Sequence, residues 1–383
     1  MRRAFRGDLV HGGDVYRNKV KYDFSISVNP LGMPQAVREA AVAAVSDAEK
    51  YPDIQCESLR RAISGKLGCP QENVVCGNGA SELIQAFLRY VCGMNAKHQD
   101  LTKKVMIPVP CFTGYEYAVD SVNACIGDIS AEYFFLPGIT AKNPFCMTSD
   151  VLPAFLEKLR SSKPAACIIT NPNNPNGKLI ERDILEEIAS ECEKTGTWLL
   201  IDECFMELTG KADGYSFIPL LSRYKCVIVL CAFTKTFAIP GLRLGYCVTS
   251  CAETATVLRN RLPEWNVSAP AQAAGVAAVK EDAYIKEALH LISKERQFLT
   301  AELKELGFTV FPSDANFLLF CVAGAQNSTG TNLFDAFLAD GILIRDCRDI
   351  AGLGEGFYRI AVRKHAENEV LVNSLKKFCR ATK

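Results

Sequence analysis

Short, continuously apolar runs that alternate with helix-like stretches are the feature that most restricts what this chain can fold into. Such runs occupy residues 105–108, 166–170, 197–202, 226–233 and 244–249. Stretches with apolar residues at helical spacing lie between several of them. Strands of this length joined by helices are typical of βαβ units, and strands that are apolar throughout are buried on both faces. The sequence therefore predicts an α/β fold with a mostly parallel sheet.

The two ends of the chain are organised differently. Residues 1–32 contain too many Gly and Pro for a helix, so we interpret them as an arm. A long helical stretch with a break at 270–307 precedes short apolar runs and further helices, which is typical of a small α+β unit. The sequence therefore predicts an arm at 1–32, a large α/β domain at 33–265 and a small C-terminal α+β domain at 266–383.

Composition excludes several classes of partner. The 43 basic and 43 acidic residues give a formal net charge of zero, whereas nucleic-acid-binding proteins normally carry a basic excess. No apolar run approaches the roughly eighteen residues of a membrane span. The basic start of the chain is not followed by the apolar stretch of a signal peptide. We therefore expect neither a nucleic acid nor a membrane as a partner.

The 17 cysteines are an odd number, and no two of them form a C-x-x-C pair. No histidine stands at a ligand spacing from the closest pairs, so the sequence predicts no metal site. Several cysteines, such as Cys167 and Cys226, lie in apolar runs, where cysteine acts as a small hydrophobic residue. Free cysteines in this number are typical of a reducing compartment, and we expect a cytoplasmic protein.

Polar groups follow three of the predicted strands, at the positions where open α/β sheets bind ligands. One strand ends in Asp202 and Glu203. A carboxylate there could hold a metal, act as a base, pair with a protonated ring nitrogen, or only cap a helix. The Asn- and Pro-rich segment 171–177 requires a fixed turn with side-chain amides near the same edge of the sheet.

The third group is Lys235, which lies among aromatic residues after the run at 226–233. Burial could lower its pKa enough for it to form a Schiff base. Arg243, further along, could bind a phosphate as a planar fork. Either residue alone could equally be a surface ion-pair partner. The evidence for a functional site comes from the order in which the turn, the carboxylate and the lysine follow strand ends of one domain.

In that order the motifs resemble the fold-type I pyridoxal-phosphate enzymes, in the branch of the histidinol-phosphate aminotransferases and threonine-phosphate decarboxylases. The likeness rests on N-P-N-N-P-x-G at 171–177, D-E-x-F at 202–205 and T-K-x-x-A-x-P-G-L-R-L-G-Y at 234–246. It extends over almost the whole chain. It implies an aspartate-aminotransferase-like fold and pyridoxal 5'-phosphate as the cofactor.

The resemblance assigns roles at the cofactor ring. Lys235 would form the Schiff base and carry protons, and Asp202 would keep the pyridine nitrogen protonated. Asn174 would donate a hydrogen bond to the ring oxygen, and Phe112 would stack on the ring face. Lys235 and Asp202 are therefore the predicted catalytic residues.

The resemblance also implies how the cofactor phosphate is bound. Its ligands would lie where a Gly-rich turn enters a helix, and near the lysine: Gly79, Ala80, Ser81, Thr234 and Arg243. Tyr51 resembles the tyrosine that reaches the phosphate in the neighbouring subunit. This likeness implies a homodimer with shared active sites.

The arm and the small domain would bind the substrate. H-G-G-D at 11–14 and D-F-S-I-S-V-N-P-L-G at 23–32 are similar to H-G-G-N and D-F-S-x-N-x-N-P-L-G in the decarboxylases, whose arm closes over the active site. The implied substrate ligands are His11, Asn29, Asn174, Arg345 and Arg359. The two arginines would bind the phosphate and the carboxylate of the substrate.

Three departures from the family pattern concern the ring, the cofactor phosphate and the substrate phosphate. Ala232 stands where a phosphate-binding Ser is common, and Thr234 could compensate for it. Phe205 replaces the Tyr of the histidinol-phosphate aminotransferases, and Phe there is similar to the decarboxylases. Asp14 stands where Asn is common. Its charge would repel a substrate phosphate unless the side chain points away.

The sequence therefore predicts decarboxylation of a small phosphorylated amino acid, L-threonine O-3-phosphate being favoured, to (R)-1-aminopropan-2-yl phosphate for cobalamin biosynthesis. The alternative is an aminotransferase acting on histidinol phosphate or a related phosphorylated or phosphonate amine, which would need a keto-acid acceptor. A non-catalytic, cofactor-binding regulator is disfavoured because Lys235, Asp202 and Arg243 are all present. One methyl group separates threonine phosphate from serine phosphate, and the sequence does not distinguish them.

Overall fold

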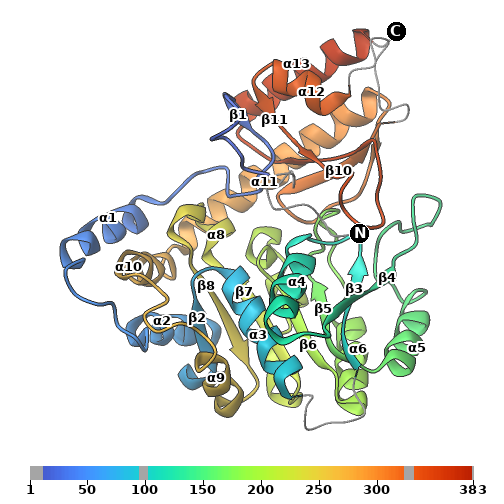
Figure 1. Ribbon diagram of the computed structural model, residues 1–383. Helices are drawn as coiled ribbons and strands as arrows, with labels where there is room; N and C mark the ends of the chain where they lie inside the picture. Colours follow the sequence, from blue (N-terminus) through green and yellow to red (C-terminus); the bar gives the residue numbers. More distant parts are fainter. Residues whose placement is uncertain (1–11, 95–101, 323–331, 382–383) are drawn as a thin grey trace.

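The computed structural model describes residues 12–94, 102–322 and 332–381. Figure 1 shows a larger lower part, which we call the large domain, and a smaller upper part in orange and red, the small domain. The large domain is built on a central sheet with helices on both faces. No helix among the described residues is long and apolar enough to cross a membrane.

The sheet of the large domain has seven strands in the order β2-β8-β7-β6-β5-β3-β4. Neighbouring strands are parallel, except that β8 runs antiparallel to both β2 and β7. The strands are β2 (Val74–Gly77), β3 (Thr102–Val109), β4 (Ser130–Phe135), β5 (Pro164–Thr170), β6 (Trp198–Asp202), β7 (Val227–Ala232) and β8 (Gly245–Thr249). The predicted α/β fold with a mostly parallel sheet is confirmed.

Helices cover both faces of the sheet because the central strands are apolar on both sides. Every residue of β5 is buried. Ile168 of this strand belongs to one apolar core, and its neighbours Cys167 and Ile169 belong to the core on the opposite face. The first core is covered by α3 (Ala80–Met94), α4 (Gly114–Ile126) and α9 (Ala252–Arg259), and the second by α5 (Leu152–Ser162) and α6 (Arg182–Thr195).

Helix α6 illustrates how the sequence sets these elements. Its buried residues recur at helical spacing and include Ile184, Leu185, Ile188 and Cys192. The helix ends at Gly196, whose φ of 76° is the left-handed conformation that glycine adopts easily. Short helical turns join the larger elements: α7 (Ala212–Tyr215), α8 (Phe233–Thr236), η2 (Val45–Asp47), η3 (Gln71–Asn73), η4 (Met206–Thr209), η5 (Ile218–Arg223) and η6 (Pro240–Leu242).

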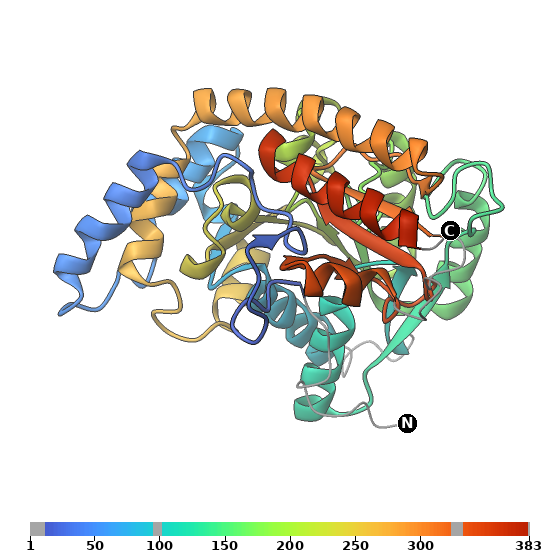
Figure 2. The same cartoon turned by 90° about the horizontal axis from the view of Figure 1, so that it is seen from above.

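Three helices form a separate group at the β2 edge of the sheet: α1 (Gln35–Ala44), α2 (Glu57–Leu67) and α10 (Ala269–Ala278). Helices α1 and α10 run side by side in both views (Figures 1 and 2). Ala271 and Ala274 of α10 share a core with Val37 of α1 and Leu59 of α2. The sequence-based division assigns 269–278 to the small domain, whereas the structure packs these residues against α1 and α2, because their alanine-rich face allows a close approach.

The small domain packs helices on an antiparallel sheet with the strand order β12-β13-β10-β9. Its strands are β9 (Thr309–Val310), β10 (Phe317–Cys321), β12 (Arg345–Asp346) and β13 (Phe357–Ala361). Its helices are α11 (Asp282–Glu305), α12 (Leu333–Ala339) and α13 (His365–Ala381). Figure 2 shows α11 and α13 side by side above the large domain. The predicted small α+β unit is confirmed.

Residues 22–24, which precede α1, are built into the small domain. Strand β1 (Tyr22–Asp23) pairs in parallel with β11 (Ile342–Leu343). The N–H of Phe24 donates to the Leu343 carbonyl at 2.7 Å, and its own carbonyl accepts from the Ala361 N–H at 2.8 Å. The Phe24 ring is fully buried in the small-domain core. Residues 22–24 are therefore part of the small-domain core.

Phe24→Ala should destabilise the protein by about 3–5 kcal/mol, because it leaves a cavity in the small-domain core. Urea denaturation followed by circular dichroism measures the loss. Tyr16→Ala, which truncates a 97% exposed ring, is the matched control and should change the stability by less than about 0.5 kcal/mol. A loss below about 1 kcal/mol for Phe24→Ala would show that the segment contributes little to that core.

Candidate active site

The three polar groups predicted from the sequence meet where β5, β6 and β7 end. Thr170 at the end of β5 pairs with Asp202 of β6, which pairs with Leu230 of β7. Beside these ends lies a cavity of about 300 Å³, bounded on its other side by the small domain. The predicted residues that line it are Ala80, Ser81, Phe112, Asn174, Asp202, Thr234, Lys235, Arg243, Arg345 and Arg359.

Asp202 is buried and held by two hydrogen bonds. Its Oδ2 accepts from the Tyr115 hydroxyl at 2.7 Å, and its Oδ1 accepts from the Cys204 N–H at 2.9 Å. Burial raises the pKa of Asp202, although both hydrogen bonds favour the carboxylate. The Tyr115 ring also meets Phe112 edge-on, with 5.5 Å between the ring centres. A buried carboxylate oriented in this way is suited to a protonated ring nitrogen.

Tyr115 was not identified from the sequence, because a single tyrosine in an ordinary helix carries no signal. It projects from the first turn of α4, which directly follows the Phe112 segment. Its hydroxyl also contacts Thr170 Oγ1 at 2.9 Å, so it bridges β5 and β6. The position of Asp202 therefore depends on a helix that the motif itself does not include.

Lys235 follows β7 directly, in the single turn of α8. Burial and the positive charges of Arg359 and Arg243 lower the pKa of Lys235 from 10.5 to about 8. Its Nζ lies 5.7 Å from the centre of the Phe205 ring. With a pKa near 8, about a quarter of the molecules carry an unprotonated amine at pH 7.5. Lys235 can therefore act as a nucleophile and also hold a proton.

The arm contacts the cavity through Gly12 and residues 25–27 rather than through Asn29. Asn29 donates from Nδ2 to the Thr236 carbonyl and from its backbone N–H to the Lys235 carbonyl, both at 2.9 Å. The side chain thus binds the backbone of Thr236, beside the lysine, and the backbone N–H binds the lysine carbonyl itself, whereas the sequence predicts a contact with the substrate. The reason is that its amide is satisfied by a backbone group of the large domain.

Ser27 is a cavity residue that the sequence reasoning missed. Its buried hydroxyl lines the cavity and has no hydrogen-bond partner among the described residues. A buried hydroxyl without a hydrogen-bond partner destabilises the folded protein unless a bound ligand supplies the missing hydrogen bond. The arm motif contained a signal, because the family pattern has Asn at this position, two residues before Asn29.

The backbone at the start of α3 forms a cradle. Gly79 has a φ of +79°, and a Cβ on this residue would lie 2.6 Å from Arg243 Nη2. A Cβ on Gly245 would lie 2.7 Å from the Ala80 nitrogen. The two glycines therefore let Arg243, the turn and β8 approach one another closely. The unpaired N–H groups of the first helical turn and the guanidinium can bind a phosphate there.

Two arginines line the small-domain side of the cavity. Arg359 of β13 donates to Asn174 Oδ1 and, at 2.8 Å, to the Ser25 carbonyl, and its buried Nε has no partner among the described residues. Burial lowers the pKa of Arg359 to about 10. Arg345 donates to both carboxylate oxygens of Asp349 at 2.8 and 2.9 Å. Arg359 can bind an anion. The positive charge of Arg345, in contrast, is already balanced in part by Asp349.

Two further described positions, Tyr51 and Asp14, are not among the residues that line the cavity. His11 lies outside the described residues. Tyr51 is 79% exposed and stacks on Trp265 with 4.6 Å between ring centres, so its predicted contact with a neighbouring subunit stays a prediction. Asp14 accepts hydrogen bonds from Arg17 at 3.3 Å, so its carboxylate faces its own turn. Its charge is therefore directed away from the cavity.

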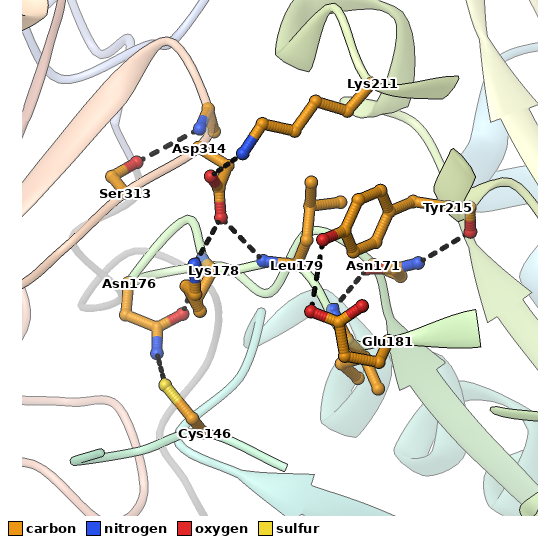
Figure 3. Close-up of polar contacts among 12 residues, drawn as sticks. Cys146, Asn171, Asn176, Lys178, Leu179, Glu181, Lys211, Tyr215, Ser313 and Asp314 are labelled. Atoms are coloured by element: carbon orange, nitrogen blue, oxygen red, sulfur yellow. Dashed lines mark hydrogen bonds and ion pairs between the residues drawn. The ribbon is translucent and has the colours of Figure 1, made fainter. Parts of the chain in front are cut away.

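The asparagines of the Asn-Pro turn divide into two groups. Asn174 lines the cavity. Asn171 donates to the Tyr215 carbonyl at 3.3 Å, and Asn176 contacts Cys146 Sγ at 3.6 Å, both away from the cavity (Figure 3). The density of asparagines in the motif thus reflects the fixing of the turn as well as the binding of a ligand.

This arrangement fits pyridoxal phosphate. The glycine cradle has room for a phosphate beside Arg243, and the carboxylate of Asp202 can pair with the ring nitrogen. Lys235, whose pKa is low, lies in the same cavity and can bond to the aldehyde carbon. Phe112 lines the same cavity and can face the ring.

Comparison with known proteins agrees with the geometry. The profile of the family described as Aminotransferase class I and II matches residues 19–375. The threonine-phosphate decarboxylase of Salmonella typhimurium is 31% identical over 355 residues, covering 92% of this chain and 90% of that protein. The histidinol-phosphate aminotransferase 2 of Archaeoglobus fulgidus is 30% identical over 363 residues, with 94% of each chain covered. The crystal structure of the histidinol-phosphate aminotransferase from Clostridium acetobutylicum has a TM-score of 0.81 at 30% identity, covering 94% of this chain and 99% of that one.

Capture of pyridoxal phosphate by the apoprotein should become faster with rising pH and level off above about pH 8, because the unprotonated Lys235 amine is the nucleophile. Its pKa is lowered to about 8, so the reactive fraction grows up to that value and little beyond it. For an ordinary lysine the rise would continue to about pH 10.4. Stopped-flow absorbance of the bound cofactor measures the rate.

The matched variant for this measurement is Arg359→Gln, which removes a positive charge that lowers the pKa of Lys235. The midpoint of the pH dependence of its capture rate should therefore lie at higher pH than that of the protein with Arg359. A capture rate that continues to increase about tenfold per pH unit up to about pH 10 would contradict the lowered pKa.

Proposed function

Because the chain belongs to the aminotransferase class I and II family, whose members use pyridoxal 5'-phosphate, we propose that it removes CO₂ from a phosphorylated amino acid. The favoured substrate is L-threonine O-3-phosphate. The product would be (R)-1-aminopropan-2-yl phosphate, which the resemblance assigns to cobalamin biosynthesis. In this proposal the enzyme is a cytoplasmic homodimer.

The observation that carries the proposal is the pair of arginines on the substrate side of the cavity. Arg359 can bind a carboxylate as a planar fork, and Arg345 offers a second cationic group whose charge Asp349 balances in part. A short substrate with a carboxylate at one end and a phosphate at the other satisfies both arginines. Histidinol phosphate has a phosphate but no carboxylate, so it would supply an anion to only one of the two arginines.

The bond that breaks at the substrate α-carbon must stand perpendicular to the cofactor ring. When bound, the cofactor supplies a protonated ring that accepts the electron pair left by the bond that breaks. Asp202 would hold the proton on the ring nitrogen. Arg359 would bind the substrate carboxylate in the same cavity as Lys235 and so position the group that leaves as CO₂.

Lys235 would supply the proton that replaces CO₂ at the α-carbon. With its pKa near 8, most of its amine is protonated at neutral pH, and it lies in the same cavity as Arg359. The brace from Asn29 to the Lys235 carbonyl holds the backbone of this residue in place. General acid catalysis requires a proton donor that is held in position and whose pKa lies near the working pH, and Lys235 meets both conditions.

A second candidate is an aminotransferase, which the similarity to histidinol-phosphate aminotransferases favours. It would remove a proton rather than CO₂ from the α-carbon, and the two arginines could bind a dicarboxylic keto acid. Phe205 argues against this candidate, because it offers no hydroxyl to the ring oxygen. Its ring instead packs against Phe317, with 5.1 Å between the ring centres.

Incubation of the pyridoxal-phosphate-loaded protein with L-threonine phosphate, without any keto acid, should release CO₂ and aminopropanol phosphate in equal amounts. Trapped CO₂ and mass spectrometry of the product measure both. O-phospho-L-serine is the parallel substrate, because it tests the contribution of one methyl group. If no CO₂ forms, and histidinol phosphate or glutamate converts the cofactor to its pyridoxamine form, the protein is an aminotransferase.

Lys235→Ala should abolish turnover and change the visible absorbance of the bound cofactor, because no other lysine lines the described part of the cavity. Absorbance spectra of the reconstituted variant and an assay of CO₂ release measure the two effects. Lys377→Ala, at an exposed ion pair with Asp340, is the control and should keep both properties. Substantial turnover by Lys235→Ala would disprove the role of this lysine.

A further inference from the structure

Asp314, in the loop between β9 and β10, connects the small domain to the Asn-Pro turn of the large domain. The residue is buried, with 8% of its surface exposed. Its carboxylate accepts hydrogen bonds from Lys211 Nζ at 2.7 Å, Lys178 Nζ at 3.0 Å and the Leu179 N–H at 3.2 Å (Figure 3). All three donors belong to the large domain, and two of them follow the turn directly. One carboxylate of the small domain thus clamps two segments of the large domain.

The backbones on the two sides of this clamp also fit closely. The Asp314 N–H donates to the Gly177 carbonyl at 2.8 Å. Gly177 has a φ of +75°, and a Cβ there would lie 2.1 Å from Ser313 Oγ. Arg296 of α11 donates to the carbonyls of Asp314 and Ala315 at 2.9 and 2.7 Å. The loop that carries Asp314 is therefore fixed to the small domain. The position of this loop can in turn set the position of the Asn-Pro turn.

The turn held in this way carries Asn174, which lines the active-site cavity. Asn174 Oδ1 accepts a hydrogen bond from Arg359, so this side chain also contacts the small domain. Asp314 itself does not line the cavity. Its influence on the cavity must pass through the turn.

The electrostatics of the clamp favour a permanent contact. Burial opposes ionisation of Asp314, but the hydrogen bonds from Lys211 and Lys178 outweigh it and hold the pKa of Asp314 below its usual value. The carboxylate is therefore charged at any pH at which the enzyme would work. Its loss would leave two ammonium groups facing each other and the Leu179 N–H without its acceptor.

We propose that Asp314 is a positioning residue that sets the placement of Asn174 at the cofactor. The affinity for the cofactor then depends on the position of the small domain. The proposal rests on the cofactor site, which decarboxylase and aminotransferase share. It therefore stands or falls independently of the reaction proposed above. Its test uses cofactor binding rather than turnover.

Asp314→Asn keeps the size of the side chain and removes its charge. Cofactor affinity should fall about tenfold, because Asn174 is no longer held at the ring oxygen. The pH titration of the absorbance of the bound cofactor should shift to higher pH, since a hydrogen bond to the ring oxygen favours its anionic form. Equilibrium dialysis and absorbance titration measure the two effects. Asp340→Asn is the matched control, because Asp340 likewise accepts from a lysine and another donor, Lys377 and Ser374, but within the small domain.

A double-mutant cycle with Asn174→Ala separates positioning from general stability. If Asp314 acts through Asn174, Asp314→Asn should change the affinity less than about twofold in the Asn174→Ala background. An equal loss in both backgrounds, or no loss in either, would overturn the proposal. If Asp314→Asn does not fold, Lys178→Met removes one arm of the clamp and is judged by the same cycle.

Discussion

The active site depends on the parallel pairing of β5, β6 and β7. Parallel strands direct their carboxyl ends to one edge of a sheet, so the segments that follow them meet there although they are far apart in the chain. The strand register brings Thr170 beside Asp202, and the next strand ends just before Lys235. The apolar sequences of these strands make this arrangement stable, because helices cover both faces.

Burial then gives these polar groups their chemical properties. The same enclosure raises the pKa of Asp202 and lowers that of Lys235, and the two arginines add to the effect on the lysine. Arg359 of the small domain contributes to the shift of Lys235, whereas the pKa of Asp202 is raised by burial alone. The small domain therefore adds to the electrostatic character of a cavity whose other charged groups, such as Arg243, belong to the large domain.

Much of the fold could be read from the sequence, and its gaps have physical causes. The central strands begin or end within two residues of their predicted limits. The edge strands β2 and β4 were not singled out. Strand β4 is half-exposed along most of its length, so it lacks the continuous apolar run that marks the central strands. Strand β2 has only four residues, which is too short for a pattern.

The sequence by itself determined the sheet and the order of the strand-end motifs, because apolar periodicity and motif spacing are local properties. The type of cofactor followed from the resemblance of those motifs to a known family. The tertiary structure decided which polar groups face the cavity. Asn29 and Ser27 lie two residues apart in the arm. Asn29 binds the backbone of the turn that carries Lys235, whereas Ser27 lines the cavity. Asp314 has no motif to mark it, and it acquires a role only where the small domain meets the Asn-Pro turn. Side-chain direction and contacts between distant segments depend on packing, and packing is a property of the whole fold.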